Sequence, residues 1–160
     1  HMWPPAAGTP EEYFPVLMEN TRRLFPEKLW RIENTVRKCD TGWEAFFKIT
    51  EEKEETLSNN QLYVLSNYRK INGAAVVLYP ELLKQVYERF SGNYFVIPSS
   101  VHEVLLLKER GEEEEEAYYN RMVSEVNENH VEPEEVLSEH VYYYSGEKGL
   151  CKIRAEGRIE

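Results

Sequence analysis

Long hydrophobic runs, glycine-rich phosphate loops and metal-type cysteine spacings are all missing from this sequence. No apolar run approaches the roughly 20 residues that a membrane helix requires, so we expect no membrane partner. The two cysteines, Cys39 and Cys151, match no metal-ligand pattern, and no signal peptide precedes them. We therefore expect free thiols in a reducing cytoplasm. Without a phosphate-binding loop or a ligand cluster, we expect neither a cofactor nor a metal.

Basic charge is also scarce. The chain has 29 acidic against 19 basic residues, and its formal net charge is −10. Nucleic-acid affinity depends on lysine and arginine displacing counterions, so this acidic balance argues against a nucleic-acid partner. Hydrophobic residues make up 41% of the chain and aromatic residues 12%, which is a globular composition. At 160 residues the chain can bury one core of ordinary size without a metal or a disulfide.

The N-terminal third is predicted to be helical. Residues 1–8 are interpreted as a tag remnant followed by a flexible, proline-rich leader. Thr9, with Glu12 three residues later, has the pattern of a helix N-cap, and Pro15 either kinks that helix or begins it. Approximate helical spacing at 29–36 predicts a second helix. An aromatic stripe predicts a third, so that 9–56 forms a helical segment; the stripe consists of Trp43, Phe46 and Phe47.

Residues 57–160 are predicted to form a sheet-and-helix core in the same domain. Two amphipathic helices are expected, one with an apolar stripe from Leu82 to Phe90 that Gly92 caps, the other with a stripe from Tyr118 to Val126. Strands and a closing hairpin surround them. The expected fold is α+β, with N-terminal helices followed by a mixed sheet in ββαββαββ order. The predicted strands cover 62–65, 74–78, 94–97, 104–107, 141–144 and 150–153.

An ordered series of motifs resembles a bacterial family known as domain of unknown function 5688. The resemblance covers roughly 13–26 and 61–144, and it implies the C-terminal part of longer family members. No activity comes with it. The motifs include Tyr63-Val-Leu-Ser-Asn67, Asn72-Gly-Ala-Ala75, Leu78-Tyr-Pro80, Pro98-Ser-Ser-Val-His-Glu-Val104 and Glu134-Glu-Val-Leu-Ser138.

The stretch Pro98–Glu103 is the most chemically suggestive part of the sequence. A nucleophilic serine needs a histidine base that a carboxylate orients, and Ser99, Ser100, His102 and Glu103 supply all three types. Neighbours on an extended segment rarely point at one place, and no G-x-S-x-G elbow is present. A turn whose polar side chains bond to the backbone is the competing interpretation. His130 and His140 lack a further ligand at metal-site spacing.

Polar residues at strand ends suggest a binding site instead. We expect six residues to form a polar pocket for a small molecule or a peptide terminus: Asn67, Asn72, Ser99, Ser100, His102 and Glu103. The expected function is therefore a non-enzymatic binding or regulatory module of a larger cytoplasmic bacterial protein. A hydrolase that uses the Pro98–Glu103 loop is the first alternative. The second is a homodimer formed through a strand edge or the tyrosines of 141–144.

Overall fold

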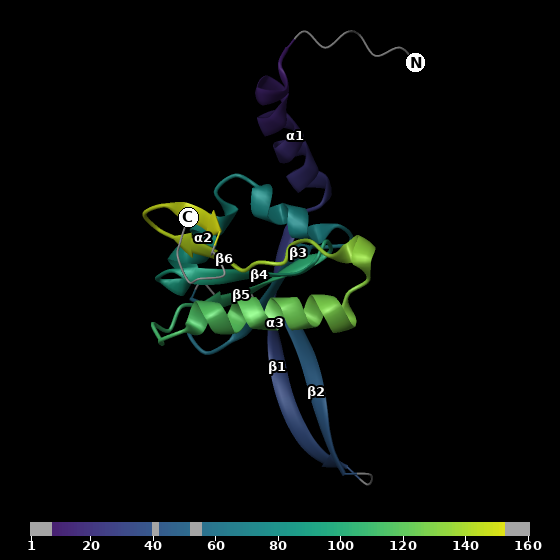
Figure 1. The fold of residues 1–160 in the computed structure, drawn as a ribbon. Helices are drawn as coiled ribbons and strands as arrows, with labels where there is room; N and C mark the ends of the chain where they lie inside the picture. The colour runs from purple at the N-terminus through teal and green to yellow at the C-terminus, as the bar shows by residue number, and fades with distance from the viewer. Residues whose placement is uncertain (1–7, 40–41, 52–55, 153–160) are drawn as a thin grey trace.

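The computed structural model of the chain describes residues 8–39, 42–51 and 56–152 (Figure 1). Its centre is an antiparallel sheet of seven strands in the order β2-β1-β3-β5-β4-β6-β7. All described strand pairs are antiparallel, so the expectation of a mixed sheet was wrong. The strands are β1 (Glu27–Cys39), β2 (Gly42–Glu51), β3 (Leu62–Asn67), β4 (Tyr94–Ser100), β5 (Glu103–Lys108), β6 (Tyr142–Ser145) and β7 (Gly149–Lys152).

The predicted N-terminal helix is present as α1 (Pro10–Leu24), with Pro15 inside it. The Thr9 hydroxyl accepts from the Glu12 N–H and the Glu12 carboxylate accepts from the Thr9 N–H, which together form the expected capping box. The two helices predicted after α1 were wrong. That segment is the long β1–β2 hairpin, whose outer part extends beyond the body (Figure 1). The side chains of the aromatic stripe lie outside the described residues.

The hairpin replaced the expected helices because strand pairing decides a marginal pattern. Residues 27–32 of β1 pair with β3 and residues 30–39 pair with β2, so β1 is a central strand over 30–32, where the two pairings overlap. Apolar spacing over only eight residues cannot distinguish a helix from a strand. The two pairings together give every residue of β1 a partner strand on at least one side, and this long-range pairing outweighs the weak local preference for a helix.

The two later helices cover opposite faces of the sheet. Helix α2 (Leu82–Phe90) packs with Tyr94 and Val96, and α3 (Glu115–His130) packs with Phe95 and Ile97. Successive residues of a strand point to opposite faces, so the alternation in β4 places one helix on each side. Both predicted amphipathic helices are confirmed. The residue in the left-handed conformation at the end of α2 is Ser91, with φ of 54°, and not the predicted Gly92.

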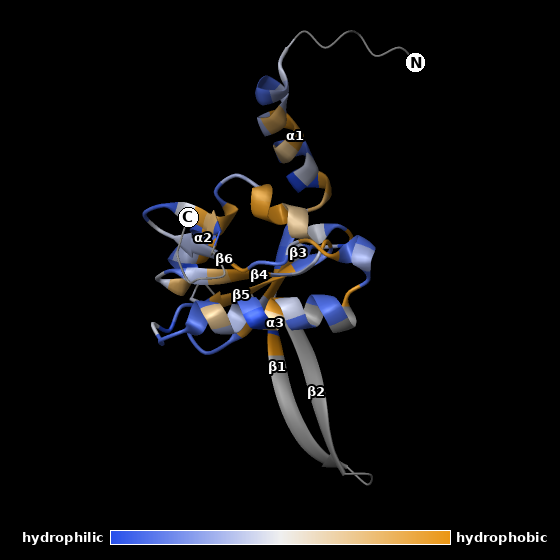
Figure 2. Ribbon diagram, viewed as in Figure 1, coloured by the Kyte–Doolittle hydropathy of each residue, from blue (hydrophilic) through white to orange (hydrophobic). Residues whose placement is uncertain are grey.

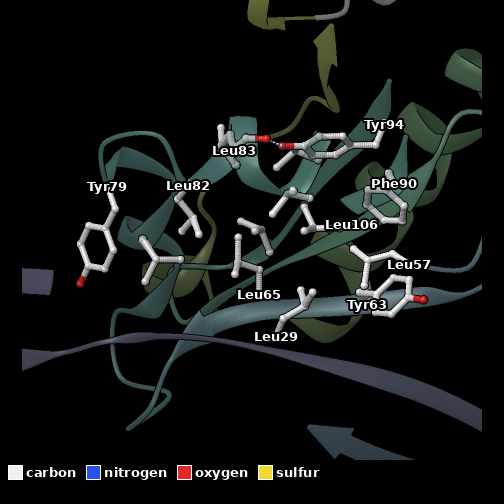
Figure 3. Packing of buried hydrophobic residues seen from close by; sticks show 14 of the residues in the cluster. Leu29, Leu57, Tyr63, Leu65, Tyr79, Leu82, Leu83, Phe90, Tyr94 and Leu106 are labelled. Atoms are coloured by element: carbon white, nitrogen blue, oxygen red, sulfur yellow. Dashed lines mark hydrogen bonds between the residues drawn. The ribbon is translucent and has the colours of Figure 1, made fainter. Parts of the chain in front are cut away.

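The core beneath α2 is rich in aromatic rings (Figure 3). Phe90 contacts Tyr63 edge to face at 5.6 Å between ring centroids, and Tyr94 at 5.3 Å. The buried Tyr94 hydroxyl donates to the Leu83 carbonyl at 2.7 Å. Burial raises the pKa of this phenol, so it stays protonated and keeps donating. This bond ties the first strand after α2 back to the helix.

The predicted strand at 74–78 was wrong. This segment is the 3-10 helix η1 (Gly73–Leu78), with Ala74 and Val76 buried. A short continuous apolar run fits a buried helical turn as well as a strand, and the alanines here favour the turn. The observed order after residue 61 is therefore β3, η1, α2, β4, β5, α3, η2 (Pro133–Glu135), β6 and β7. The short helix at 133–135 and the closing hairpin agree with prediction.

A cluster of carboxylates lies where β5 leads into α3. The Glu109 carboxylate accepts from the Tyr143 hydroxyl at 2.7 Å, and burial together with this carboxylate raises the pKa of Tyr143. Burial, followed by the charges of Glu109 and Glu115, raises the pKa of Glu116. The folded chain thus holds a proton on Glu116 at a higher pH than the unfolded chain does. This stabilising contribution is complete in acid and is lost as pH rises through the raised value.

We predict that Glu116→Gln removes this pH dependence. The variant should gain stability relative to the wild type as pH rises from about 4 to about 7, because only the wild type must ionise a partly buried carboxyl. Urea denaturation midpoints at the two pH values measure the difference. Glu113→Gln, an exposed change in the same acidic run, is the matched control. An equal gap between variant and wild type at both pH values would contradict the prediction.

Candidate functional site

The predicted polar loop at Pro98–Glu103 is a tight hairpin. Strand β4 continues to Ser100, a two-residue turn follows at Val101–His102, and β5 begins at Glu103. The register shifts between Pro98 and Ser100, which marks a β-bulge. The Ser100 hydroxyl accepts from the backbone N–H of His102 at 3.1 Å. The serine therefore stabilises the turn by a local side-chain bond.

The end of β3 packs directly against this turn. Ser66 is fully buried, and its hydroxyl donates to the carbonyl of His102 at 2.6 Å. The Ala74 N–H donates to the Val101 carbonyl at 3.1 Å. Between them lies Gly73, where a Cβ would fall 1.9 Å from the Ser66 Oγ and 2.6 Å from the His102 carbonyl oxygen. A glycine is therefore required at position 73 because neighbouring backbone atoms approach it closely.

His102 connects three segments through its ring. Its Nδ1 accepts from the backbone N–H of Asn72 at 3.0 Å, and its Nε2 lies 3.3 Å from a carboxylate oxygen of Glu135. Because Nδ1 accepts, the neutral ring carries its proton on Nε2, which then donates to Glu135. The Val101 N–H adds a bond of 2.9 Å to the Glu135 carbonyl. The turn is thereby joined to the start of η1 and to η2.

Asn67 organises the loop that enters η1. It is buried, its amide group donates to the Ile71 carbonyl at 2.7 Å, and its side-chain oxygen accepts from the N–H groups of Arg69 and Ile71. Lys70 and Asn72 have positive φ angles in this loop. An asparagine side chain can replace missing backbone partners in such a turn. The predicted ligand-binding residue thus has its hydrogen-bonding groups engaged by its own loop.

The place where the β4–β5 turn meets the end of β3 and the starts of η1 and η2 is called the His102 junction. Four of the six predicted site residues converge there: Asn67, Asn72, Ser100 and His102. Ser99 and Glu103 are half-buried and make no side-chain hydrogen bond to the other four in the described chain. Within the same residues, no hydrogen bond joins either serine to the His102 ring. The carboxylate beside that ring belongs to Glu135, which sequence reasoning missed because it lies 33 residues further along. These hydrogen bonds join the β4–β5 turn to β3, η1 and η2, so their role is structural.

An apolar pocket of about 240 Å³ lies beside the junction on the α2 face of the sheet. Val77 of η1 and Pro98 of β4 line it near the junction, and Leu137 lines it two residues after Glu135. Its polar groups are the hydroxyls of Ser138 and Tyr142, which lie 3.4 Å apart. The remaining lining residues are Val96, Val104 and Leu150. The sequence does not reveal the pocket, because these residues come from six parts of the chain: η1, β4, β5, the loop at 137–138, β6 and β7.

A larger groove of about 570 Å³ runs along α3 and is lined mainly by polar and charged side chains. Its carboxylates come from Glu125, Glu128 and Glu139, with His140 at one side. In the part of the chain with described placement, no three His, Cys, Asp or Glu residues are grouped as metal ligands. Cys151 is a buried free thiol, whereas the side chain of Cys39 lies outside the described residues. No described helix has the length and apolarity to cross a membrane.

The chain belongs to the family of unknown function DUF5688, whose sequence model matches residues 7–146. This match confirms the resemblance that the motifs suggested. No curated protein matches the chain, and no solved structure matches it.

Proposed function

We propose that this member of a family without an assigned activity is a non-enzymatic binding module. Its apolar pocket beside the His102 junction would receive an apolar side chain from an extended segment of a partner protein. The observation that carries the proposal is the apolar lining. Side chains of a kind that usually packs inside a protein, such as those of Val77, Val104 and Leu150, line an open cavity here. Apolar surface around a concave site marks an interaction surface on a soluble domain.

The pocket volume favours a side chain over a larger ligand. An apolar cavity of about 150 Å³ can hold benzene, whereas pockets for drug-sized molecules span about 300–1,000 Å³. The 240 Å³ here falls between the two. It fits one aromatic or branched apolar side chain and leaves no room for a nucleotide or a flavin.

The surroundings of the pocket favour a protein segment as the occupant. Leu137 and Leu150 of the lining are themselves exposed, and Leu78, next to Val77 in the chain, is exposed too, so a partner would cover apolar surface at the rim of the cavity as well. Leu150 belongs to β7, the last strand of the sheet order. An outer strand offers backbone groups that an extended peptide can pair with, and alternate side chains of such a peptide enter neighbouring pockets.

The rigid junction supports the pocket. Pro98 and Leu137 of the lining flank Ser100 and Glu135 in sequence, and the backbone bond between Val101 and Glu135 fixes the distance between their segments. A preformed site costs less conformational entropy on binding than one that must be ordered. The role of the predicted polar residues is then to position the apolar site: the Asn67 side chain and the His102 ring bond to backbone groups, and Asn72 supplies the backbone N–H from which the ring accepts.

The hydrolase alternative has less support from these contacts. Its base would be His102, whose Nδ1 accepts from a backbone N–H and whose Nε2 faces Glu135. Ser99 or Ser100 would have to displace one of these partners before losing a proton to the ring. We place the module in the bacterial cytoplasm as part of a larger protein. The net charge of −10 supports a protein or small-molecule partner over nucleic acid.

We predict that Leu150→Glu weakens peptide binding by about tenfold or more, because a carboxylate at the pocket loses its hydration when an apolar side chain enters. The probes are fluorescent peptides with one Trp, Phe or Leu in an otherwise polar extended sequence, measured by fluorescence polarisation. Leu150 is exposed, so the variant should keep its fold. Tyr118→Glu, on exposed α3 surface away from the pocket, is the control. Equal affinity for both variants would refute the pocket, and no binding by any probe would refute the proposed ligand class.

A further inference from the structure

Helix α1 presents an apolar face that the other described residues leave uncovered. No residue of the helix is buried, and Figure 1 shows it projecting from the body. Figure 2 shows hydrophobic residues along it. Successive residues of a helix are about 100° apart, which places Tyr13, Leu17 and Leu24 within a stripe about 40° wide. All three are exposed, as are Phe14 and Val16 at the sides of the stripe.

Among the described residues, the contacts between α1 and the body come from the C-terminal half of the helix. Arg22 forms a bidentate pair with Glu27 and donates to the Pro80 carbonyl at 3.0 Å, and Met18 packs against the core below α2. A helix of 15 residues is marginally stable in water unless its apolar face packs against something. The capping box at Thr9 stabilises the N-terminal half as a helix, although that half makes none of these contacts. An ordered amphipathic helix without a cover implies a partner surface.

The charges of α1 are complementary to a second α1 in antiparallel orientation. The first turn carries Glu11 and Glu12, and the last turn carries Arg22 and Arg23. Glu12 and Arg23 are 11 residues apart, which is about three turns, so they lie on the same side of the helix. In an antiparallel pair centred near Leu17, a residue before the centre of one helix lies opposite a residue equally far after the centre of the second helix, on the same edge of the interface. Glu12 of each copy then meets Arg23 of the second copy, and the two helix dipoles also oppose each other.

We propose that the protein forms a symmetric homodimer by antiparallel packing of α1 against α1 of a second copy. The apolar stripes of both helices form the interface, and two reciprocal Glu12–Arg23 pairs set its direction. Arg22 takes a smaller part because Glu27 already engages it within the chain. The interface is confined to two short helices, so the dimer has a larger dissociation constant than an obligate dimer and dissociates at a higher protein concentration.

The test is sedimentation equilibrium of the full chain over a concentration series. The wild type is expected to approach twice the chain mass of 18.9 kDa. Leu17→Glu, at the centre of the stripe, should raise the dissociation constant by about tenfold or more, because it places two carboxylates in the apolar interface. Ile71→Glu is the matched control: the two native side chains are 57% and 59% exposed, and Ile71 lies outside α1. Circular dichroism checks that each variant keeps its helices.

Exchanging the charges of Glu12 and Arg23 distinguishes antiparallel pairing of two α1 helices from binding of α1 to a different protein segment. Arg23→Glu alone and Glu12→Arg alone should each weaken the dimer, since each places like charges opposite one another. An equimolar mixture of the two variants should recover most of the lost affinity, because both reciprocal pairs become attractive again. Glu12→Arg also removes the carboxylate that accepts from the Thr9 N–H, so the mixture stays somewhat weaker than the wild type. A monomer at every concentration, or a dimer that Leu17→Glu leaves intact, would overturn the proposal. Loss of association with no recovery in the mixture would also overturn the antiparallel arrangement and point to a different protein segment as the cover.

Discussion

Replacing Gly73 with alanine is expected to lower the free energy of unfolding by about 3–4 kcal/mol. The added methyl would lie 1.9 Å from the Ser66 hydroxyl, 2.6 Å from the His102 carbonyl oxygen and 2.7 Å from the Asn67 backbone nitrogen. Two of these three atoms are backbone, so a side-chain rotation cannot relieve the overlap. Moving η1 away from β3 would also break the buried Ser66–His102 hydrogen bond. Chemical denaturation of variant and wild type measures the effect.

The control for this change is Gly92→Ala. A Cβ at position 92 would meet only the flexible end of Lys108, at 3.3 Å, which can move at little cost. We expect a change within about 1 kcal/mol there. If Gly73→Ala were as mild as Gly92→Ala, the close packing of η1 against the β4–β5 turn would be wrong, and with it the rigid support of the apolar pocket.

The second large effect is expected for Phe90→Ala, at about 3–5 kcal/mol. Phe90 is almost completely buried and lies between Tyr63 and Tyr94, with ring centroids 5.6 and 5.3 Å away. Truncation to alanine removes the buried apolar surface of the Phe90 ring. It also leaves a cavity between two rings whose strands are held in place by pairing. The loss is a large share of the total stability of an ordinary domain, about 5–15 kcal/mol. Thermal and urea unfolding followed by circular dichroism would both report it.

Tyr68→Ala is a suitable control for Phe90→Ala. The Tyr68 ring is 64% exposed and contacts the Lys28 ammonium at 4.8 Å from its centroid. An exposed cation–π contact contributes about 0.5–1 kcal/mol, so the control should lose no more than that. Comparable losses at positions 68 and 90 would mean that the core is not centred below α2.

The predicted site was partly recoverable from sequence. Asn67, Asn72, Ser100 and His102 were grouped because polar residues at strand ends tend to meet, and the structure brings them together. Their role differed from expectation, since the Asn67, Ser100 and His102 side chains bond to backbone groups and Asn72 contributes only its backbone N–H. Whether a side chain faces a ligand or its own backbone depends on one or two side-chain torsion angles, and the residue type does not specify their values. Glu135 was not found for a related reason: nothing in its neighbourhood indicates a contact with a turn 33 residues away.

The sequence by itself determined the parts of the fold that local chemistry specifies. The capping box at Thr9, the apolar stripes of α2 and α3, and the short β-rich runs of β3, β4 and β5 each have a period long enough, or a signal strong enough, to identify them. Family membership followed from ordered motifs. These features depend on interactions within a few turns or a few residues, so one segment carries all the information that they need.

Tertiary structure alone decided the β1–β2 hairpin, the 3-10 helix η1, the antiparallel sheet order and the apolar pocket. Each depends on free energy gained between segments distant in sequence. Pairing with β3 makes β1 a strand despite its helical spacing, and close contact with Ser66 and Val101 holds 73–78 in a helical turn. Where local preferences are nearly balanced, long-range hydrogen bonds and burial determine the outcome, because their combined free energy exceeds the small difference between the local alternatives.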